Sequence, residues 1–263
     1  MAYDRESFLN AAREKFSDEN FAKIQDALNY ATDKHAGVIR LSGKPYITHP
    51  IYVAALLLEW GMDRDTIIAG LLHDVVEDTP TTAEEIGTKF GDDVALLVDG
   101  VTKVSAARAG REDVSKYLPE TKDTLMKLLV ATGSDVRVLI IKLADRIHNL
   151  RTLQYQTPEK QRKKSRESLD VFGPLADRLN MGRVKSEIED TSFRYLKPKR
   201  YEYLRDELSR RVGESRGNLD KVEEETGQKL TAEKIPFELN GRMKSIYSLH
   251  KKLCKHASVD DIH

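Results

Sequence analysis

Four residues in this sequence are of types that bind metal ions. His49 stands in a loop that precedes a helix, the adjacent pair His73-Asp74 lies within a helix in the apolar stretch IIAGLLHDVVEDT, and Asp145 falls on a later helix. A histidine–aspartate pair inside an apolar run is costly to bury unless both groups find partners. A divalent cation shared with the second histidine and the second aspartate would satisfy all four. Mixed nitrogen and oxygen ligands suit Mn, Fe or Zn better than Ca, so the sequence predicts a hydrolytic metal centre.

Two further carboxylates follow the histidine–aspartate pair at helical spacing. His73 and Glu77 are four residues apart, as are Asp74 and Asp78, so each pair would lie on neighbouring turns of one helix face. Carboxylates near a metal-activated water are what a hydrolase needs, because a carboxylate can take a proton from the water or align it. The spacing alone is equally compatible with a polar helix end before Pro80.

A polar stripe is predicted on the helix over residues 135–153. Lys142, Asp145, Asn149 and Thr152 follow one another at steps of three, four and three residues, and the other faces carry Val, Leu and Ile. A stripe of this kind either faces solvent or lines a site. The apolar flanks favour a site, because buried charges are costly. The alternative is a simple ion pair between Lys142 and Asp145 across one turn.

The loop RLSGKPYITHP, residues 40–50, ends close to a metal-type histidine and contains a glycine and two prolines. It presents Arg40, Ser42, Lys44 and Tyr46 ahead of His49. An arginine guanidinium can stack on a purine or contact a phosphate with two donors at once. The loop therefore indicates a phosphorylated substrate beside the metal.

The composition is that of an ordinary soluble protein with a polar surface. Of the 263 residues, 40% are hydrophobic and 33% charged, and the 43 Lys and Arg residues balance the 43 Asp and Glu residues. A net charge of zero argues against a protein that coats nucleic acid. The single cysteine, Cys254, allows no disulfide within the chain, which fits a reducing compartment. We find no signal peptide and no apolar run near the roughly 20 residues that span a bilayer, and we expect a cytoplasmic protein without a membrane or nucleic-acid partner.

Almost every segment shows helical patterning, so the predicted fold class is all-α. Helices are expected over residues 19–36, 51–60, 63–79, 82–90, 122–153 and 162–190, the last interrupted near Gly173-Pro174. Residues 93–101 are apolar enough to be buried, and residues 104–121 are expected to form a mobile loop.

The C-terminal part of the chain changes in character twice. Residues 198–234 are highly charged and are expected to form a helical linker, either one solvated helix or a helical hairpin. From Ile235 the run IPFEL has a strand-like pattern, and a helical pattern follows it. We therefore predict a metal-binding helical bundle over 1–197, the linker, and a short α/β beginning of a second domain over 235–263.

Six segments carry a resemblance to a known family: HAGVIRLSGKPYITHP (35–50), AGLLHDVVEDT (69–79), FGDDVALLVDGVTKV (90–104), VRVLIIKLADRIHNLRTL (136–153), PLADRLNMGRVKSEIEDTSFRYL (174–196) and GRMKSIYSLHKKL (241–253). They resemble the RelA/SpoT family of alarmone enzymes almost continuously from about residue 20 to residue 255. The resemblance implies an all-helical HD domain that removes pyrophosphate from the ribose 3′ position of guanosine tetraphosphate and pentaphosphate (ppGpp and pppGpp) in stringent-response control. It also implies Mn²⁺ as the cofactor and GDP or GTP as the product.

The resemblance also assigns roles to individual residues by motif position. The implied metal ligands are His49, His73, Asp74 and Asp145. The implied catalytic pair is Glu77 and Asp78. The implied substrate-binding residues are Arg40, Ser42, Asn149 and Thr152 for guanine and ribose, with Lys103 and Lys142 for phosphate. The chain departs from the family pattern at Leu41, where many relatives carry a basic residue, and at Asn180, where a glycine is usual.

In this family a synthetase domain follows the hydrolase, and the segment 241–253 resembles its opening. The carboxylates that would bind Mg²⁺ in that domain are expected beyond residue 263. We therefore expect no synthetase activity from this chain, and we expect residues after 235 to be poorly ordered or packed back on the helical body. The full-length protein would contact the ribosome through C-terminal regions.

Two other functions are compatible with these motifs. A related HD phosphohydrolase could act on another nucleotide phosphorylated at the 3′ or 2′ position. A catalytically silent module could sense a nucleotide and signal to the adjoining domain. The intact ligand set and the Glu77-Asp78 pair favour an enzyme over the silent module.

Overall fold

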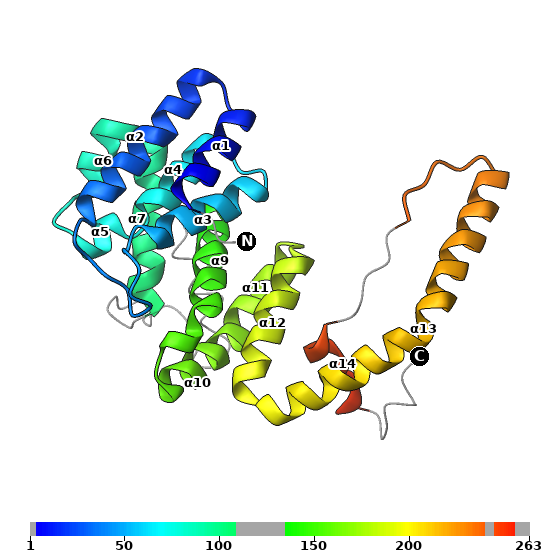
Figure 1. Ribbon diagram of the computed structural model, residues 1–263. Coiled ribbons are helices and arrows are strands. Elements are labelled where there is room, and N and C mark those ends of the chain that lie inside the picture. Colours follow the sequence, from blue (N-terminus) through cyan, green and yellow to red (C-terminus); the bar gives the residue numbers. More distant parts are fainter. Residues whose placement is uncertain (1–3, 109–134, 240–244, 256–263) are drawn as a thin grey trace, which may run out of the picture.

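The computed structural model describes residues 4–108, 135–239 and 245–255, and it is built from helices (Figure 1). The helices before the gap are α1 (Arg5–Lys15), α2 (Asp18–Lys34), α3 (Thr48–Glu59), α4 (Arg64–Leu72), α5 (Val75–Asp78), α6 (Ala83–Phe90) and α7 (Asp92–Arg108). Those after it are α9 (Val136–Arg151), the 3₁₀ helix η2 (Leu153–Tyr155), α10 (Pro158–Glu167), the π-helix η3 (Ser168–Phe172), α11 (Gly173–Arg178), α12 (Gly182–Leu196), α13 (Pro198–Ala232) and α14 (Ile246–Leu253). The described residues contain no strand, and the predicted all-α class is confirmed.

Helix α4 lies at the centre of the N-terminal bundle, where it packs against α2, α3, α7 and α9. Every residue from Thr66 to Leu72 is buried. A helix that is apolar on all sides is stable only where other helices surround it. His73, which directly follows α4, therefore lies in the interior of the protein.

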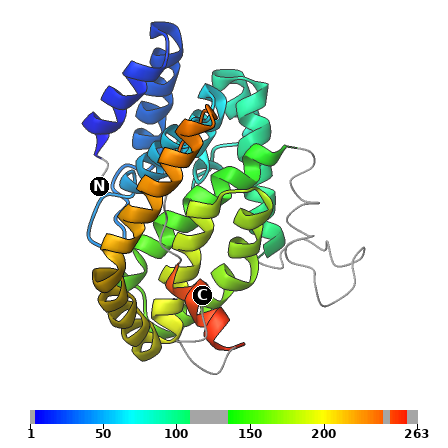
Figure 2. The same cartoon turned by 90° about the vertical axis from the view of Figure 1, so that its right-hand side faces the viewer.

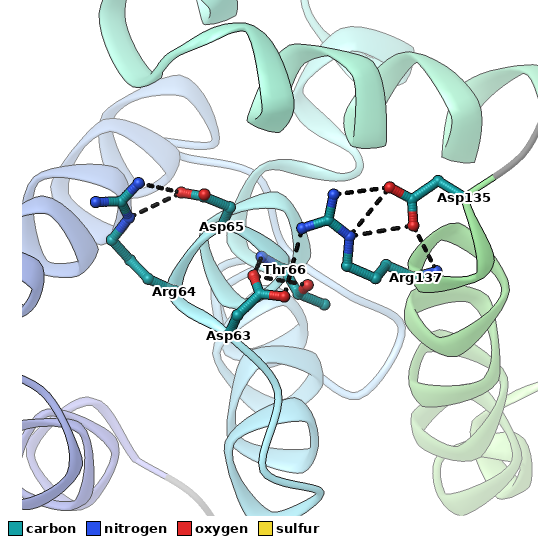
Figure 3. A network of polar contacts seen from close by, with 6 residues as sticks. All are labelled: Asp63, Arg64, Asp65, Thr66, Asp135 and Arg137. Carbon is teal, nitrogen blue, oxygen red and sulfur yellow. Dashed lines mark hydrogen bonds and ion pairs between the residues drawn. The ribbon is translucent and has the colours of Figure 1, made fainter.

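A polar network joins the N-terminal ends of α4 and α9 (Figure 3). Asp63 caps α4 by accepting a hydrogen bond from Thr66 N at 2.8 Å, and Asp135 caps α9 by accepting one from Arg137 N at 2.9 Å. Arg137 then bridges the two caps, with its guanidinium 2.7 Å from Asp135 and 3.4 Å from Asp63. The side chains that satisfy the free backbone groups of each helix thus also fix the two helices relative to each other.

The predicted loop over 104–121 and the first part of the predicted helix over 122–153 fall largely outside the described residues. Among the described residues, α7 continues to Arg108, so residues 104–108 are helical and not part of a loop as expected. Helix α7 packs against α4, α6 and α9.

The interruption predicted at Gly173-Pro174 is not where the chain turns. There, the π-helix η3 leads directly into α11. Pro174 is tolerated because it occupies the first turn of α11, where a missing N–H costs nothing. The chain turns instead at residues 179–181, where Asn180 has a φ of +56°. Asparagine enters this left-handed region more readily than most residues, so the residue that replaces the usual glycine keeps the turn.

The C-terminal segment consists of a long helix and a short one that folds back (Figures 1 and 2). The charged linker forms the single helix α13, so the hairpin alternative is wrong. α14 packs against α12 and α13, where Ile246 joins Phe193 and Leu204 in a small apolar cluster. Residues 235–239 form no strand, because the described residues offer these backbone groups no strand to pair with. The domain boundaries stay a prediction.

In the part of the chain that the structure describes, no helix is both long enough and apolar enough to cross a membrane.

Close packing of α7 on α9 yields a stability prediction. A Cβ added at Gly100 would lie 2.8 Å from Val138 Cγ2, and Val138 is buried and stiff at χ1. We expect Gly100→Ala to lower the free energy of unfolding by about 1–2 kcal/mol, because overpacking outweighs the gain in helix propensity. Gly87→Ala on α6 is the matched control, since its Cβ would meet nothing nearer than 3.4 Å. Urea denaturation followed by circular dichroism measures both, and equal stability would contradict the close approach.

Candidate metal centre and adjoining pocket

The four candidate ligands come from three helices that pack together in the bundle. His49 lies in the first turn of α3, not in the preceding loop, because α3 begins at Thr48. The helix includes Pro50 in its first turn, where no backbone donor is required. His73 and Asp74 are not within a helix as predicted but at the junction of α4 and α5. His73 Nδ1 bonds to the Gly70 carbonyl at 2.8 Å, which competes with the regular helical bond to that oxygen.

The candidate ligand atoms converge on one point. Those of His49, His73 and Asp74 all lie within 4.8 Å of one another. His49 Nε2 is 3.4 Å from Asp74 Oδ2 and 3.3 Å from Asp145 Oδ1, so the fourth residue joins through His49. His73 Nε2 is 3.2 Å from Asp74 Oδ1. The sequence therefore brings together two imidazoles and two carboxylates from distant segments.

The charges in this cluster suit a cation. Burial alone would raise the pKa of Asp74, but the adjacent His73 and His49 hold that pKa well below its ordinary value. Burial acts in the same direction on Asp145, where the hydrogen bond to His49 and the charge of Lys142 keep the pKa below its ordinary value. Both carboxylates therefore stay ionised although little of either side chain reaches solvent, and they need positive charge close by.

The hydrogen bonding of the two His73 ring nitrogens is that expected of a metal ligand. Its Nδ1 donates to the Gly70 carbonyl, so the neutral ring has its lone pair on Nε2. That Nε2 is buried, and its 3.2 Å contact with Asp74 Oδ1 lacks the geometry of a hydrogen bond in the described structure. A metal-ligating histidine typically donates its other ring N–H to a fixed acceptor. The orphaned nitrogen and the two carboxylates fit a divalent cation.

Tyr46 extends the cluster toward the loop. Its hydroxyl donates to Asp74 Oδ2 at 2.8 Å, and its ring packs against the buried His35 with centroids 4.6 Å apart. Burial and the charge of Asp74 raise the pKa of Tyr46, so the phenol keeps its proton and remains a donor. This contact holds the Asp74 carboxylate in place.

The two candidate catalytic carboxylates lie at the solvent side of the cluster. Glu77 and Asp78 are exposed and belong to the short helix α5, directly after Asp74. Asp78 is near enough to Tyr46 to contribute to the raised pKa of the phenol. Both acids are thus accessible from solvent beside a buried cluster.

Two members of the predicted polar stripe contact Asp145. Asn149 Nδ2 donates to Asp145 Oδ1 at 2.5 Å, and the buried Lys142 places its Nζ 3.9 Å from Asp145 Oδ2. The alternative of an ion pair between Lys142 and Asp145 is therefore realised, and the pair also adjoins His49. The amide of Asn149 is directed to the candidate ligand.

A pocket of about 410 Å³ adjoins the cluster, within the size range of small-molecule sites. Three predicted substrate-binding residues line it: Arg40, Ser42 and Thr152. Arg40 and Ser42 reach it from a tight turn, closed by a 2.9 Å bond from Arg40 N to the Lys44 carbonyl. Gly43 makes the turn possible with a φ of +78°.

Other predicted residues lie apart from this pocket. Lys103 is exposed on α7, where its Nζ is 2.6 Å from Asp99, and it is not part of the pocket lining. Leu41 is exposed at the turn and does not line the pocket either.

Arg40, which lines the pocket, places its guanidinium over the Tyr46 ring, 5.7 Å from the ring centroid.

The sequence reading missed several residues that surround the cluster. They are Tyr52, His148 and Arg151, which line the pocket beside the cluster. Tyr46, one of the residues that the 40–50 loop was expected to present, contacts Asp74. Burial, with nearby His49 and Arg40, lowers the pKa of His148 to about 2, so its ring is neutral. His148 follows Asp145 by three residues and precedes Thr152 by four, so it fits the helical spacing as well as Asn149 does, and that spacing could have singled it out.

Comparisons with known proteins agree with this geometry. A family model described as an HD domain matches residues 27–182. The chain is 42% identical over 259 residues to a probable GTP pyrophosphokinase of Mycobacterium leprae, covering 98% of this chain and 32% of that protein. It is 43% identical over 244 residues to a guanosine-3′,5′-bis(diphosphate) 3′-pyrophosphohydrolase of Spiroplasma citri, covering 92% of this chain and 32% of that protein.

A third relative carries both activities in its name. The chain is 37% identical over 236 residues to the bifunctional (p)ppGpp synthase/hydrolase SpoT of Escherichia coli, covering 90% of this chain and 33% of that protein. The chain spans about a third of the length of these relatives. The matched HD domain and these identities over most of the chain show that it belongs to the RelA/SpoT family of HD-domain proteins.

Proposed function

We propose that this chain hydrolyses the 3′-pyrophosphate of guanosine tetraphosphate and pentaphosphate, with Mn²⁺ held by His49, His73, Asp74 and Asp145. In this reaction the bond between the ribose 3′ oxygen and its phosphorus breaks. The oxygen of water joins the departing pyrophosphate, and a proton is delivered to the 3′ oxygen. The products are pyrophosphate and GDP or GTP.

The observation that carries the proposal is the junction of the four-residue cluster with a pocket that presents Arg40. The cluster supplies nitrogen and oxygen ligands, and the pocket supplies cations and hydroxyls that suit a phosphorylated nucleotide. Relatives whose names include hydrolysis of guanosine-3′,5′-bis(diphosphate) or of (p)ppGpp match over 92% and 90% of this chain. Together they support a hydrolase over a silent module.

Each group of residues has a separate task in the proposed reaction. A bound divalent cation would lower the pKa of water and offset phosphate charge. Glu77 and Asp78, exposed beside the cluster, would accept the proton of the attacking water and return one to the leaving oxygen. Arg40 would hold the nucleotide, and Tyr46 would keep Asp74 oriented through their 2.8 Å hydrogen bond.

Product analysis tests the function directly. The purified chain is incubated with guanosine tetraphosphate and Mn²⁺, and the products are separated by anion exchange. We expect GDP and pyrophosphate in equal amounts, and no reaction after chelation of the metal. Turnover of other 3′-phosphorylated nucleotides with no action on guanosine tetraphosphate would favour the related phosphohydrolase instead.

The first site prediction concerns the metal. Asp74→Asn should abolish turnover and remove bound Mn²⁺, because the variant loses ligand charge and disturbs the geometry of the centre. Glu59→Gln, an exposed position on α3, is the control with the same change in charge. Metal content by mass spectrometry and hydrolysis rates measure the effect. A variant that retains both metal and activity would show that Asp74 is not a ligand.

The second site prediction separates chemistry from binding. Glu77→Gln or Asp78→Asn should lower kcat by roughly 10²-fold or more, with a smaller change in KM and unchanged metal content. The reason is that these carboxylates act on the water and are not expected to hold the substrate. Steady-state kinetics with each variant gives both constants. An intact kcat with a raised KM would instead assign the residue to substrate binding.

The third site prediction concerns Arg40. We expect Arg40→Ala to raise KM for guanosine tetraphosphate by tenfold or more, about 1.4 kcal/mol, without a change in Mn²⁺ affinity. Arg40→Lys should rescue poorly, because an ammonium keeps the charge and loses the flat face that stacks on a purine. If lysine restores KM fully, Arg40 acts only as a counter-charge to phosphate.

A further inference from the structure

A second histidine, His148, contacts the candidate ligand His49. The Nδ1 atoms of His49 and His148 are 2.6 Å apart, and both side chains are buried. The two rings are tilted by 33° with centroids 4.8 Å apart. His148 comes from α9, one turn after Asp145, so it approaches His49 from the helix that carries the fourth candidate ligand.

The hydrogen bond between the two Nδ1 atoms determines which nitrogen of each ring carries a proton. Only one hydrogen can lie between two nitrogen atoms that form a hydrogen bond. When the lone pair of His49 Nε2 faces a metal ion, the proton of the neutral ring is on Nδ1. His148 Nδ1 must then accept that proton, and the proton of His148 itself must be on Nε2.

The ring of His148 is held firmly enough to act as this acceptor. Tyr52 packs on it with centroids 4.4 Å apart. The Tyr52 hydroxyl accepts a hydrogen bond from Arg151, whose guanidinium forms a two-pronged ion pair with Glu187 on α12. The acceptor is therefore anchored through neighbouring side chains to a helix outside the metal cluster.

The two candidate histidine ligands are thus oriented in different ways. His73 donates to a backbone carbonyl, which is the common arrangement. His49 has a side-chain acceptor instead, which can be replaced by mutation without altering the ligand. His148 also lines the adjoining pocket, so a bound substrate would lie against the residue that orients His49.

We propose that His148 is a positioning residue that accepts the Nδ1 proton of His49, and so fixes the tautomer and ring angle with which His49 Nε2 meets the metal. This inference rests on the metal centre of the proposed function, and it does not depend on the identity of the nucleotide.

Two substitutions separate acceptance of the proton from packing. His148→Asn places an amide oxygen close to the position of the ring Nδ1 and can still accept the proton. His148→Phe keeps a ring against Tyr52 and removes the acceptor. Titration calorimetry of the full chain with Mn²⁺ alone measures the affinity, and thermal unfolding without metal checks that each variant folds. His250→Asn, on α14, is the matched control.

We expect His148→Phe to weaken Mn²⁺ binding by about 10- to 100-fold. The Mn²⁺ affinity of His148→Asn should stay within about fivefold of the wild-type value. The control should bind as tightly as the unchanged protein. Unchanged affinity in folded His148→Phe would overturn the proposal. Equal losses in both His148 variants would also overturn it, since packing and not proton acceptance would then explain the effect.

A spectroscopic measurement tests the same point without any variant. Long-range ¹H–¹⁵N spectra of the unchanged chain loaded with diamagnetic Zn²⁺ report which nitrogen of each histidine carries a proton. We expect His49 to be protonated on Nδ1 and His148 on Nε2. A proton on His148 Nδ1 would overturn the proposal. Because neither experiment contains a nucleotide, absence of ppGpp hydrolysis would count against the proposed function and leave this inference standing.

Discussion

The constraint on which the structure depends is the burial of two ionised carboxylates beside two imidazoles where α3, α4 and α9 meet. Asp74 and Asp145 lie within 3.4 Å of His49 Nε2, and their pKa values stay below the ordinary range despite burial. Such groups destabilise a fold unless positive charge compensates them. The apolar, buried helix α4 leads directly into this cluster, because His73 follows its last residue.

Helix α9 is restrained at two points along its length. The caps of α4 and α9 are tied together by Arg137 at their N-terminal ends. Further along α9, Arg146 lies 4.0 Å over the Phe172 ring and bonds to Ser168, both in the π-helix η3. Arg146 directly follows Asp145, so the same helix turn is fixed to the second half of the bundle while it presents a candidate ligand. A metal centre requires this rigidity, because small shifts of a ligand weaken the site.

The sequence was sufficient to predict the all-α fold, most helices and the cluster of four candidate ligands, because each depends on local patterning or on the cost of burying charge. It misplaced His49 and His73-Asp74 relative to helix ends. Helix α3 begins before Pro50, because a proline in the first turn of a helix needs no backbone N–H. After α4 the helix is interrupted, and there His73 Nδ1 bonds to the Gly70 carbonyl. Residues 235–239 do not form the predicted strand for a different reason. A strand-like sequence pattern forms a strand only where a second strand pairs with it. The contacts of Tyr46 with Asp74 and of His148 with His49 could not be predicted, because each joins distant segments of the chain.

Helix α9 explains how metal and pocket become parts of one site. Asp145 and His148 are three residues apart and therefore lie on neighbouring turns; the first faces the cluster, and the second both contacts His49 and lines the pocket. Thr152 continues the pocket lining at the end of the same helix. The 3.6-residue period places ligand, orienting group and pocket wall in succession along one rigid element. A shift of α9 relative to α3 and α4 would therefore move Asp145, His148 and Thr152 together, and it would disturb the candidate metal centre and the pocket at the same time.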